Sequence, residues 1–408
     1  MIRRLLPSEP WRRNQAVMVT TVFVVFTGFA FVIPFLPLYV RQLGVQNQQA
    51  VALWSGALIG VAPLLAGLLA PVWGRLADRH GQKPMAMRAL GSYVVLLLLS
   101  ALVTSVPQLL ALRIGVGLFG GIGPLGLAMA TSLAPRDQTG KAVGQVQAAQ
   151  ILSAAIGPLA GGVLADIVGI RWTFVATAGL CALALVLLLA YYQEAPPRPS
   201  ADGDPPRPPF TATLRLTGVP LLLLVLFLVN FVGRSFTPIL PLHVQALGVG
   251  ESSLATRTGI LISGYSMAAA LSATLLGRAS RSYSPRRLLI LGLAAGTATV
   301  LPMALVPSYA ALLALAIALG LASGGALTLC YTIGGLMVPA LERTTAFGFF
   351  SAAALFGGSV SPLAAGALSP LGLRGIYYLD AALFLVAALL ALLSRLGKPP
   401  AASQPAGT

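Results

Sequence analysis

The sequence has little charge for its length. Only 9% of its 408 residues are charged and 57% are hydrophobic, whereas a soluble domain carries roughly 25% charged residues. This little charge cannot cover the surface of a water-soluble globule. The solvent around most of the chain must therefore be lipid, which predicts an all-α membrane protein.

Cysteine and histidine are almost absent. Cys181 and Cys330 lie in separate apolar stretches, which predicts neither a disulfide nor a metal site. His80 and His243 are far apart, and no Ser–His spacing, metal-ligand spacing or Walker A loop is present. Gly115–Gly120 matches GxGxxG, the dinucleotide-binding fingerprint, which must follow a β-strand. This match lies inside a long apolar run, so it does not predict a dinucleotide site. These absences argue against a polytopic membrane enzyme or sensor, and no cofactor is predicted.

Twelve apolar stretches are long enough to cross a bilayer, for which a helix needs ~20 residues. Six lie in the first half, at residues 17–40, 51–73, 85–105, 108–132, 142–165 and 172–192. Six lie in the second half, at residues 218–243, 255–276, 287–306, 309–336, 345–368 and 375–396. The first stretch is too long for a signal peptide, so it is predicted to be a retained span.

Two segments outside the spans divide the chain. Residues 194–217 contain seven prolines, which favour a stiff, extended linker; a PxxP docking motif is the alternative. The predicted organisation is an N-terminal six-helix bundle at 1–193, a cytoplasmic linker at 194–217, a C-terminal six-helix bundle at 218–396 and a disordered cytoplasmic tail at 397–408.

Lysine and arginine are distributed unevenly between the predicted loops. If the N-terminus is cytoplasmic, the inside segments hold 20 of them and the outside loops hold four. By the positive-inside rule, this asymmetry predicts a protein of the cell (inner) membrane with both termini in the cytoplasm. It also explains the net charge of +16 without a nucleic-acid partner.

The second half of the sequence repeats the first at an offset of 204 residues. The matches fall mostly on glycine and proline: Pro34 and Pro37 on Pro238 and Pro241, Gly120 and Gly121 on Gly324 and Gly325, Pro135 on Pro339, and Pro158 on Pro362. Same-direction repeats of six spans predict two bundles related by an axis along the membrane normal. A central cavity exposed alternately to each side would make this a transporter; a bundle with no transport role is the alternative.

The loop after the second span is a basic turn with two glycines and one acid. Gly81 tolerates positive φ, and Asp78 can cap a helix or pair with an arginine. The segment resembles the GxLaDrxGrk signature of the major facilitator superfamily. The resemblance implies the major facilitator fold and a cytoplasmic lock, closed in the outward-open state, made by Gly74, Asp78, Arg79, Gly81 and Lys83. A basic loop that only obeys the positive-inside rule is the alternative.

Two further motifs are similar to those of the drug:proton antiporter branch of that superfamily. Ser153–Gly162 resembles its GxxxGPxxGG motif, and Gly28–Pro37 resembles its Gly-x5-Pro-x-x-Pro pattern. Trp54–Gly56 is similar to a segment of multidrug efflux proteins. Each motif alone is also explained as a packing kink; together they imply an exporter. The predicted helix hinges are Pro34, Pro37, Gly157, Pro158, Pro238, Pro241 and Pro362.

A few polar residues fall inside the apolar runs. A charge inside a span costs ~2.5–3.5 kcal/mol, so it should face a cavity or a polar partner. Arg113 is similar to the fourth-span arginine that the superfamily is thought to use in proton coupling; an arginine tied to backbone carbonyls is the alternative. Gln147, Gln150 and Ser153 are spaced for one inner stripe. The predicted cavity or coupling residues are Arg113, Gln147, Gln150, Asn230 and Arg234.

Buried carboxylates are the usual proton carriers, and no carboxylate is expected to be buried in the spans of this chain; the first and fourth spans contain none. Of the ten acidic residues, Asp166 and Asp380 approach the spans, both expected near the outer face, and they are the remaining proton-coupling candidates. The predicted function is a proton-coupled exporter of amphipathic drugs or related small molecules, favouring anionic or zwitterionic ones. A flippase or exporter of an anionic lipid or metabolite is the alternative. The expected partners are the lipid bilayer, a small amphipathic substrate and protons, for a chain that acts as a monomer.

Overall fold

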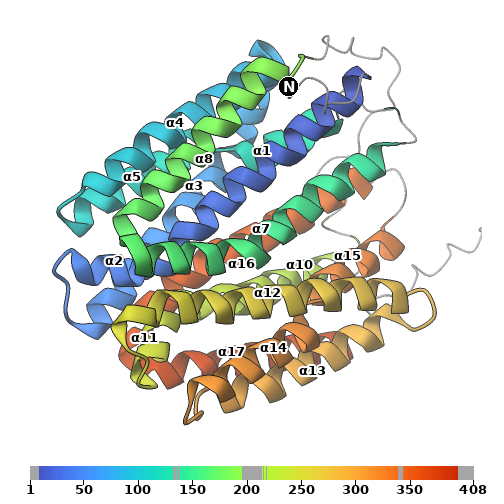
Figure 1. Ribbon diagram of the computed structural model, residues 1–408. Helices are drawn as coiled ribbons and strands as arrows, with labels where there is room; N and C mark the ends of the chain where they lie inside the picture. Colours follow the sequence, from blue (N-terminus) through green and yellow to red (C-terminus); the bar gives the residue numbers. More distant parts are fainter. Residues whose placement is uncertain are drawn as a thin grey trace, which may run out of the picture. The chain divides into compact units, whose positions relative to one another are not determined.

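The computed structural model describes residues 9–131, 135, 138–194, 214, 216, 218–338 and 343–393. Every regular element in these ranges is helical (Figure 1). Most of the predicted linker and the whole tail at 397–408 lie outside the described residues, so the predictions for them stay predictions.

The helices follow the twelve apolar runs. Those of the first half are α1 (Pro10–Val32), α2 (Leu36–Gln42), α3 (Gln48–His80), α4 (Gln82–Leu102), α5 (Val106–Phe119), α6 (Ile122–Thr131), α7 (Thr139–Val168) and α8 (Ile170–Tyr191). Those of the second half are α10 (Val219–Ser235), α11 (Leu240–Ala246), α12 (Leu254–Ala279), α13 (Pro285–Met303), α14 (Tyr309–Ser323), α15 (Ala326–Met337), α16 (Arg343–Ala367) and α17 (Gly372–Leu393).

The helices of the structure can be compared with the twelve spans predicted from the sequence. Within the described ranges, ten helical segments are long and apolar enough to cross a membrane. The pair α10 and α11, bent by 43°, makes an eleventh. The twelfth predicted span, 108–132, is occupied by α5 and α6 together. The predicted all-helical membrane fold is therefore confirmed.

Helix breaks occur at equivalent positions of the two repeats. Pro34 lies in a short 3-10 turn between α1 and α2, and Pro238 lies in the break between α10 and α11. Pro37 and Pro241 are the second residues of the helices that follow. Proline has no N–H to donate and its ring crowds the preceding turn, so a helix ends or bends there. Whether these prolines act as moving hinges stays a prediction.

Paired glycines make a second set of equivalent breaks. Gly120 and Gly121 separate α5 from α6, and Gly324 and Gly325 separate α14 from α15. Gly121 has φ of +122°, a conformation that residues with a Cβ rarely adopt. The repeat seen in the sequence is therefore also present in the backbone.

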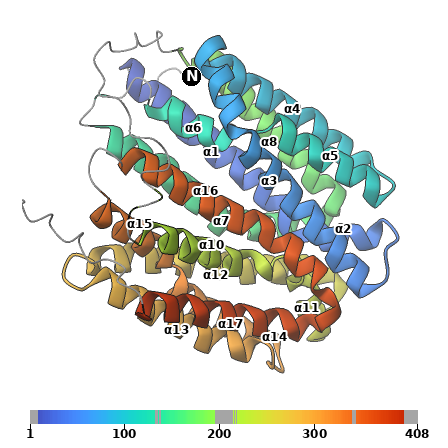
Figure 2. The same cartoon turned by 180° about the vertical axis from the view of Figure 1, so that it is seen from behind.

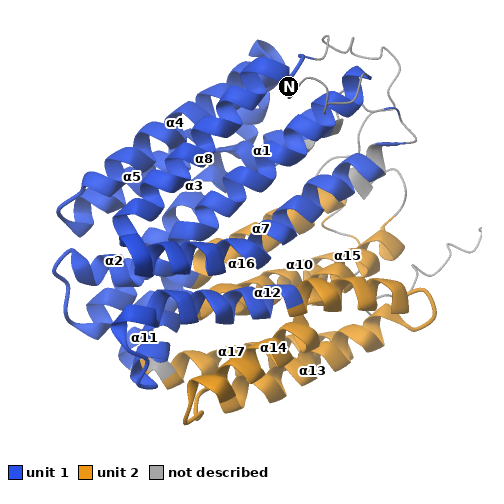
Figure 3. Ribbon diagram, viewed as in Figure 1, with its two compact units in different colours: residues 1–198, 237–267, 362–370 blue, residues 199–236, 268–361, 371–408 orange. Residues whose placement is uncertain are grey.

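The chain separates into two compact units (Figure 3). Unit 1 comprises residues 1–198, 237–267 and 362–370, and unit 2 comprises the remainder. Unit 1 thus combines the first-half helices with α11, the first part of α12 and the end of α16. The division into bundles at 1–193 and 218–396 stays a prediction.

Each unit is a layered bundle of helices. In unit 1, α1 packs on α7 and α8, and α4 packs on α8 (Figures 1 and 2). In unit 2, α17 packs on α13 and α10. Lipid tails are as apolar as a protein core, so close packing and hydrogen bonds drive such contacts. The α1–α8 contact combines close packing with a hydrogen bond. Gly28 has no side chain, so α8 approaches α1 closely there, and Thr177 Oγ1 donates to the Gly28 carbonyl at 2.7 Å.

Candidate functional site

The loop between α3 and α4 is tied to the end of α8. Gly81 has φ of +96°, in the region that favours glycine, which allows the turn from one helix into the next. Lys83 Nζ donates to the carbonyl oxygens of Leu189, at 3.2 Å, and Tyr192, at 2.7 Å. Positive charge at the carbonyl end of a helix is favourable. Two of the predicted lock residues thus have defined structural roles.

The remaining predicted lock residues lie on the surface. Asp78 and Arg79 are exposed, and among the described residues neither forms a hydrogen bond or ion pair. A Cβ at Gly74 would have open space around it. The assignment of a conformational lock to these residues therefore stays a prediction.

Glu194 belongs to this loop structurally, although it is distant in sequence and is not among the predicted lock residues. Its carboxylate accepts the backbone N–H groups of Gln82 and Lys83, both at 2.8 Å. These N–H groups begin α4 and have no partner inside the helix, so a carboxylate stabilises them. A lone glutamate after a span gives no signal in the sequence that it caps another helix.

Replacing Glu194 with alanine should lower thermal stability. Losing a cap costs about 1 kcal/mol, which corresponds to a melting temperature about 2–4 °C lower for a domain of about 200 residues. Thermal unfolding in detergent, followed by circular dichroism, measures this. Glu9→Ala is the matched control, because Glu9 makes only an exposed ion pair with Arg12. Equal melting temperatures for the two variants would contradict the capping role.

Two pairs of helices cross in unit 1 with their backbones in contact. On α3, a Cβ at Gly56 would overlap the carbonyl oxygen of Pro362 on α16. One turn further along α16, a Cβ at Gly366 would lie 2.8 Å from the carbonyl oxygen of Ala52. Real Cβ atoms do not approach backbone this closely, so glycine is required at both positions.

The second crossing, between α7 and α12, repeats the first. A Cβ at Gly259 would overlap the carbonyl oxygen of Pro158, and one at Gly162 would overlap the carbonyl oxygen of Ala255. The hydroxyl of Ser263 accepts the N–H of Leu159 at 3.1 Å. Pro158 and Gly162 are the repeat equivalents of Pro362 and Gly366. We call the two contacts the paired crossings; they use the same Pro-x3-Gly segment of each repeat.

A hydrogen bond joins equivalent residues of the two repeats. Arg41 Nη1, at the end of α2, donates to Gln245 Oε1, at the end of α11. The two residues are 204 positions apart, which is the offset of the repeat. Within unit 1, the ends of α2 and α11 therefore meet at equivalent positions of the two repeats.

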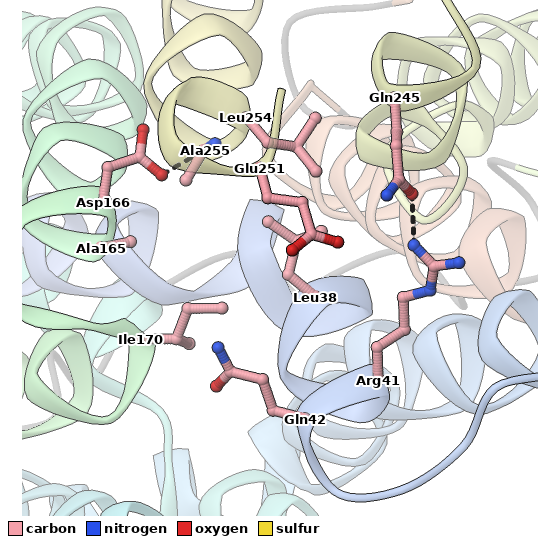
Figure 4. A pocket seen from close by; sticks show the side chains of 10 residues that line it. All are labelled: Leu38, Arg41, Gln42, Ala165, Asp166, Ile170, Gln245, Glu251, Leu254 and Ala255. Atoms are coloured by element: carbon pink, nitrogen blue, oxygen red, sulfur yellow. Dashed lines mark hydrogen bonds between the residues drawn. The ribbon is translucent and has the colours of Figure 1, made fainter. Parts of the chain in front are cut away.

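A polar pocket of about 220 Å³ lies beside this bond (Figure 4). Asp166, at the end of α7, accepts the backbone N–H groups of Ala255 at 3.2 Å and Thr256 at 2.7 Å. These groups begin α12, where a carboxylate is favourable. Glu251 lies in the pocket between Asp166 and Arg41. The Asp166 carboxylate thus fastens the α7–α12 crossing at its end.

The polar residues predicted on α5 and α7 do not share one surface. Arg113 is only 1% exposed, and its Nε donates to the Leu58 carbonyl on α3 at 3.1 Å. Gln147 is exposed and Gln150 is half-buried, but Ser153 is buried and donates to the Phe23 carbonyl on α1 at 2.8 Å. Each step of three residues turns a helix face by about 60°, so Ser153 faces away from Gln147.

On α10, a cation and aromatic rings share one face. Asn230 donates to the Leu226 carbonyl at 3.0 Å within the helix. Arg234 is exposed, and its side chain runs along Gly358 of α16. One turn before Asn230, Phe227 contacts Phe356, with ring centroids 6.1 Å apart. Apolar rings and one positive charge therefore lie on the same face of α10.

Asp380 corrects the expectation that no carboxylate is buried in the spans. It is 0% exposed, on the third turn of α17, and its Oδ2 accepts a hydrogen bond from Ser235 Oγ of α10. Packing of α10 against α17 buries it, and its partner Ser235 is not among the predicted site residues. Its expected position near the outer face stays a prediction.

The family model of the Major Facilitator Superfamily matches residues 18–256 and 222–408. This chain belongs to the major facilitator superfamily. Both repeats are covered by the match, which confirms the resemblance inferred from the loop after the second span. A superfamily member with these spans is a multi-pass membrane transporter and not an enzyme.

Individual relatives of this major facilitator protein include multidrug resistance proteins. Multidrug resistance protein MdtG of Serratia proteamaculans (strain 568) is 35% identical over 325 residues, which cover 79% of each chain. MdtG of Proteus mirabilis (strain HI4320) is 29% identical over 377 residues, covering 92% of this chain and 94% of the relative. The bacterial homologue of the human lysosomal transporter Spinster, solved inward-facing and occupied, has a TM-score of 0.79 at 18% identity, covering 95% of this chain and 97% of that one. This structure shares the fold.

Proposed function

We propose that this transporter is a proton-coupled exporter of amphipathic small molecules, drugs among them, and that it works by alternating access. The paired crossings carry the proposal. The Pro158–Gly162 segment, which resembles an exporter motif, packs backbone to backbone against α12, and its repeat equivalent packs in the same way against α16. Contacts made by equivalent elements are suited to close and open together. The multidrug resistance names of the relatives support the same substrate class.

The distribution of lysine and arginine determines the orientation of the chain in the membrane that we propose. With 20 of these residues in one set of loops and four in the other, the termini belong in the cytoplasm. The paired crossings then lie toward the outer side of the cell membrane. Export would require them to separate so that substrate can leave.

The α10 face supports an amphipathic substrate. Phe227 and Phe356 offer apolar surface, and Arg234 offers a positive charge within the same helix pair. A ring system that stacks on phenylalanine and carries an anionic group matches both features. Anionic and zwitterionic amphiphiles are therefore the preferred substrates in this proposal.

Purified protein in liposomes with an imposed pH gradient tests the proposal. Cationic, anionic and zwitterionic amphiphiles and a labelled anionic lipid are offered in parallel. We expect substrate-dependent proton movement with the amphiphiles. Transport without proton movement would exclude proton antiport as the mechanism. Movement of the labelled lipid alone would favour a flippase.

Replacing Arg234 with alanine should weaken transport of anionic amphiphiles selectively. A hydrogen bond to a charged group contributes about 1.5–3 kcal/mol, so we expect at least a tenfold higher KM for anions. Cationic substrates should change little, and Arg234→Lys should restore part of the anion transport. Arg113→Ala is the contrasting case, because the buried Arg113 supports packing and its loss should affect both classes alike. Equal losses for cations and anions in Arg234→Ala would contradict a substrate contact.

A further inference from the structure

Asp380 is a fully buried acid in the contact between α17 and α10. Ser235 Oγ lies within hydrogen-bond distance of its Oδ2, and no described group donates to its Oδ1. It is also the single acidic side chain among the described residues of unit 2. A carboxylate in such a place needs an explanation, because an uncompensated charge inside a membrane protein is costly.

The surrounding groups do not neutralise it. Tyr377, also buried, is the titratable residue one turn earlier on α17. Arg234 of α10 runs along Gly358 of α16. On α13, Arg286 lies at the first turn and donates to the carbonyl of Ala391, which is about 16 Å along α17 from Asp380. No described cation is therefore paired with the Asp380 carboxyl group.

Counting hydrogens around Ser235 distinguishes the two forms of the acid. Ser235 Oγ has two oxygen neighbours, the Val232 carbonyl at 3.0 Å and Asp380 Oδ2. A hydroxyl group has a single hydrogen to donate. If Asp380 is a carboxylate, only one of these two contacts is a hydrogen bond. If Asp380 carries a proton, it donates to Ser235 Oγ and Ser235 donates to Val232, so both contacts are satisfied.

The first repeat joins the equivalent pair of helices, α1 and α8, without an acid and through different residues. The repeat equivalent of Val232 is Gly28, whose carbonyl accepts the hydroxyl of Thr177 at 2.7 Å. The residue equivalent to Asp380 is Ala176. A neutral hydroxyl is therefore enough to join these two helices, so packing does not require an ionisable group at residue 380.

Ser235 connects the acid to the end of α10, because it is the last residue of that helix. When Asp380 loses its proton, the single hydrogen of Ser235 is shared between the carboxylate and the Val232 carbonyl in the last turn of α10. The protonation state of the acid therefore changes the hydrogen bonding at the end of this helix.

We propose that Asp380 is the residue that binds and releases the transported proton, with Ser235 as the positioning residue that links it to the end of α10. Binding takes one proton from water on one side and forms the Asp380 O–H; release returns that proton to water on the other side and leaves the carboxylate. The proposal rests on the proton-coupled export proposed above. Asp166, the other candidate, uses both carboxylate oxygens to hold α12.

Asp380→Asn and Ser235→Ala in proteoliposomes test the assignment. Asparagine keeps the size of aspartate and can donate to Ser235, but it cannot release a proton. For Asp380→Asn we expect substrate exchange without a gradient to continue, while accumulation driven by a pH gradient falls to the equilibrium level and becomes independent of pH. Ser235→Ala should retain exchange and change the pH dependence of accumulation.

Infrared spectroscopy of the purified protein provides a readout that does not depend on transport. The C=O stretch of a protonated carboxyl group should be present in the wild type, absent in Asp380→Asn and retained in Asp166→Asn. Wild-type accumulation by Asp380→Asn, or a carboxyl band that survives in it, would overturn the assignment while leaving proton-coupled export intact. Absence of substrate-dependent proton movement in the wild type would overturn both.

Discussion

Replacing Gly56 with leucine is expected to slow export about 100-fold while leaving the protein folded in the membrane. A Cβ at residue 56 would overlap the carbonyl oxygen of Pro362, and a backbone atom cannot rotate away as a side chain can. Overpacking a close contact costs about 3 kcal/mol, which depletes the closed crossing about 100-fold. A transporter that rarely closes one side completes few cycles. Gly259→Leu should act in the same way at the other crossing.

The initial rate of substrate transport in proteoliposomes measures this effect, and each helix supplies its own control. On α3, a Cβ at Gly67 has no neighbour within 4 Å. On α12, a Cβ at Gly277 meets only the Thr328 side chain, at 3.6 Å. Leucine at either position should leave transport near the wild-type rate. Equal slowing by the control and crossing substitutions would show that leucine itself, and not the crossing, is responsible.

Thiol labelling reports directly whether the α7–α12 crossing opens. Ala165 is buried and lines the pocket beside Asp166, so a cysteine placed there should react slowly with an impermeant maleimide. Gly259→Leu should increase that reaction rate. The native Cys181 and Cys330 are both buried, so the labelling reports the introduced thiol. An unchanged labelling rate would mean that the crossing stays closed despite the leucine.

Asp166→Ala should produce the second large effect, an opening of the pocket with transport reduced about 30-fold. The substitution leaves two N–H groups at the start of α12 without their acceptor. This cap is partly buried, unlike the exposed cap made by Glu194, so its loss lies at the upper end of the range, about 2 kcal/mol. That free energy corresponds to about 30-fold in the closed population. Labelling at residue 165 and the initial transport rate are the two measurements.

Glu251 supplies the matched control for Asp166. It is the other carboxylate of the same pocket and is exposed, so its replacement by alanine changes the pocket charge equally. Glu251→Ala should leave both measurements close to the wild type. If the two alanine variants behave alike, the charge of the pocket matters and the cap on α12 does not. Asp166→Asn, which keeps one acceptor oxygen, should lie between Asp166→Ala and the wild type.

The sequence predicts the helices well because hydropathy reports directly on the surrounding solvent. The glycine and proline matches also identify where helices break, as Gly121 and Pro238 illustrate, since those residues act through the local backbone. Polar partners are harder to predict. Asp380 and Ser235 are 145 residues apart, and apolar periodicity does not tell which face of α17 meets α10.

Motif resemblance also fails to predict partners that are distant in sequence. It predicts a lock role for Lys83, but the residue whose carboxylate caps α4 in this loop is Glu194, which lies outside any motif. The three-residue spacing of Gln147, Gln150 and Ser153 indicated one stripe, yet the rotation of a real helix turns Ser153 toward α1. The sequence predicts Pro158 and Pro362 as separate helix hinges and does not predict the paired crossings, because alignment of the repeats does not reveal which segments touch.

The hydrogen bond between Arg41 and Gln245 bears on how a chain of this kind could arise by gene duplication. A half-length ancestor that worked as a homodimer would place two copies of one residue at the symmetry axis. Two arginines there would repel each other, whereas two glutamines could bond. Once both halves were encoded in one gene, the two positions could mutate separately. An arginine opposite a glutamine is thus a pairing that two identical halves cannot make at equivalent positions.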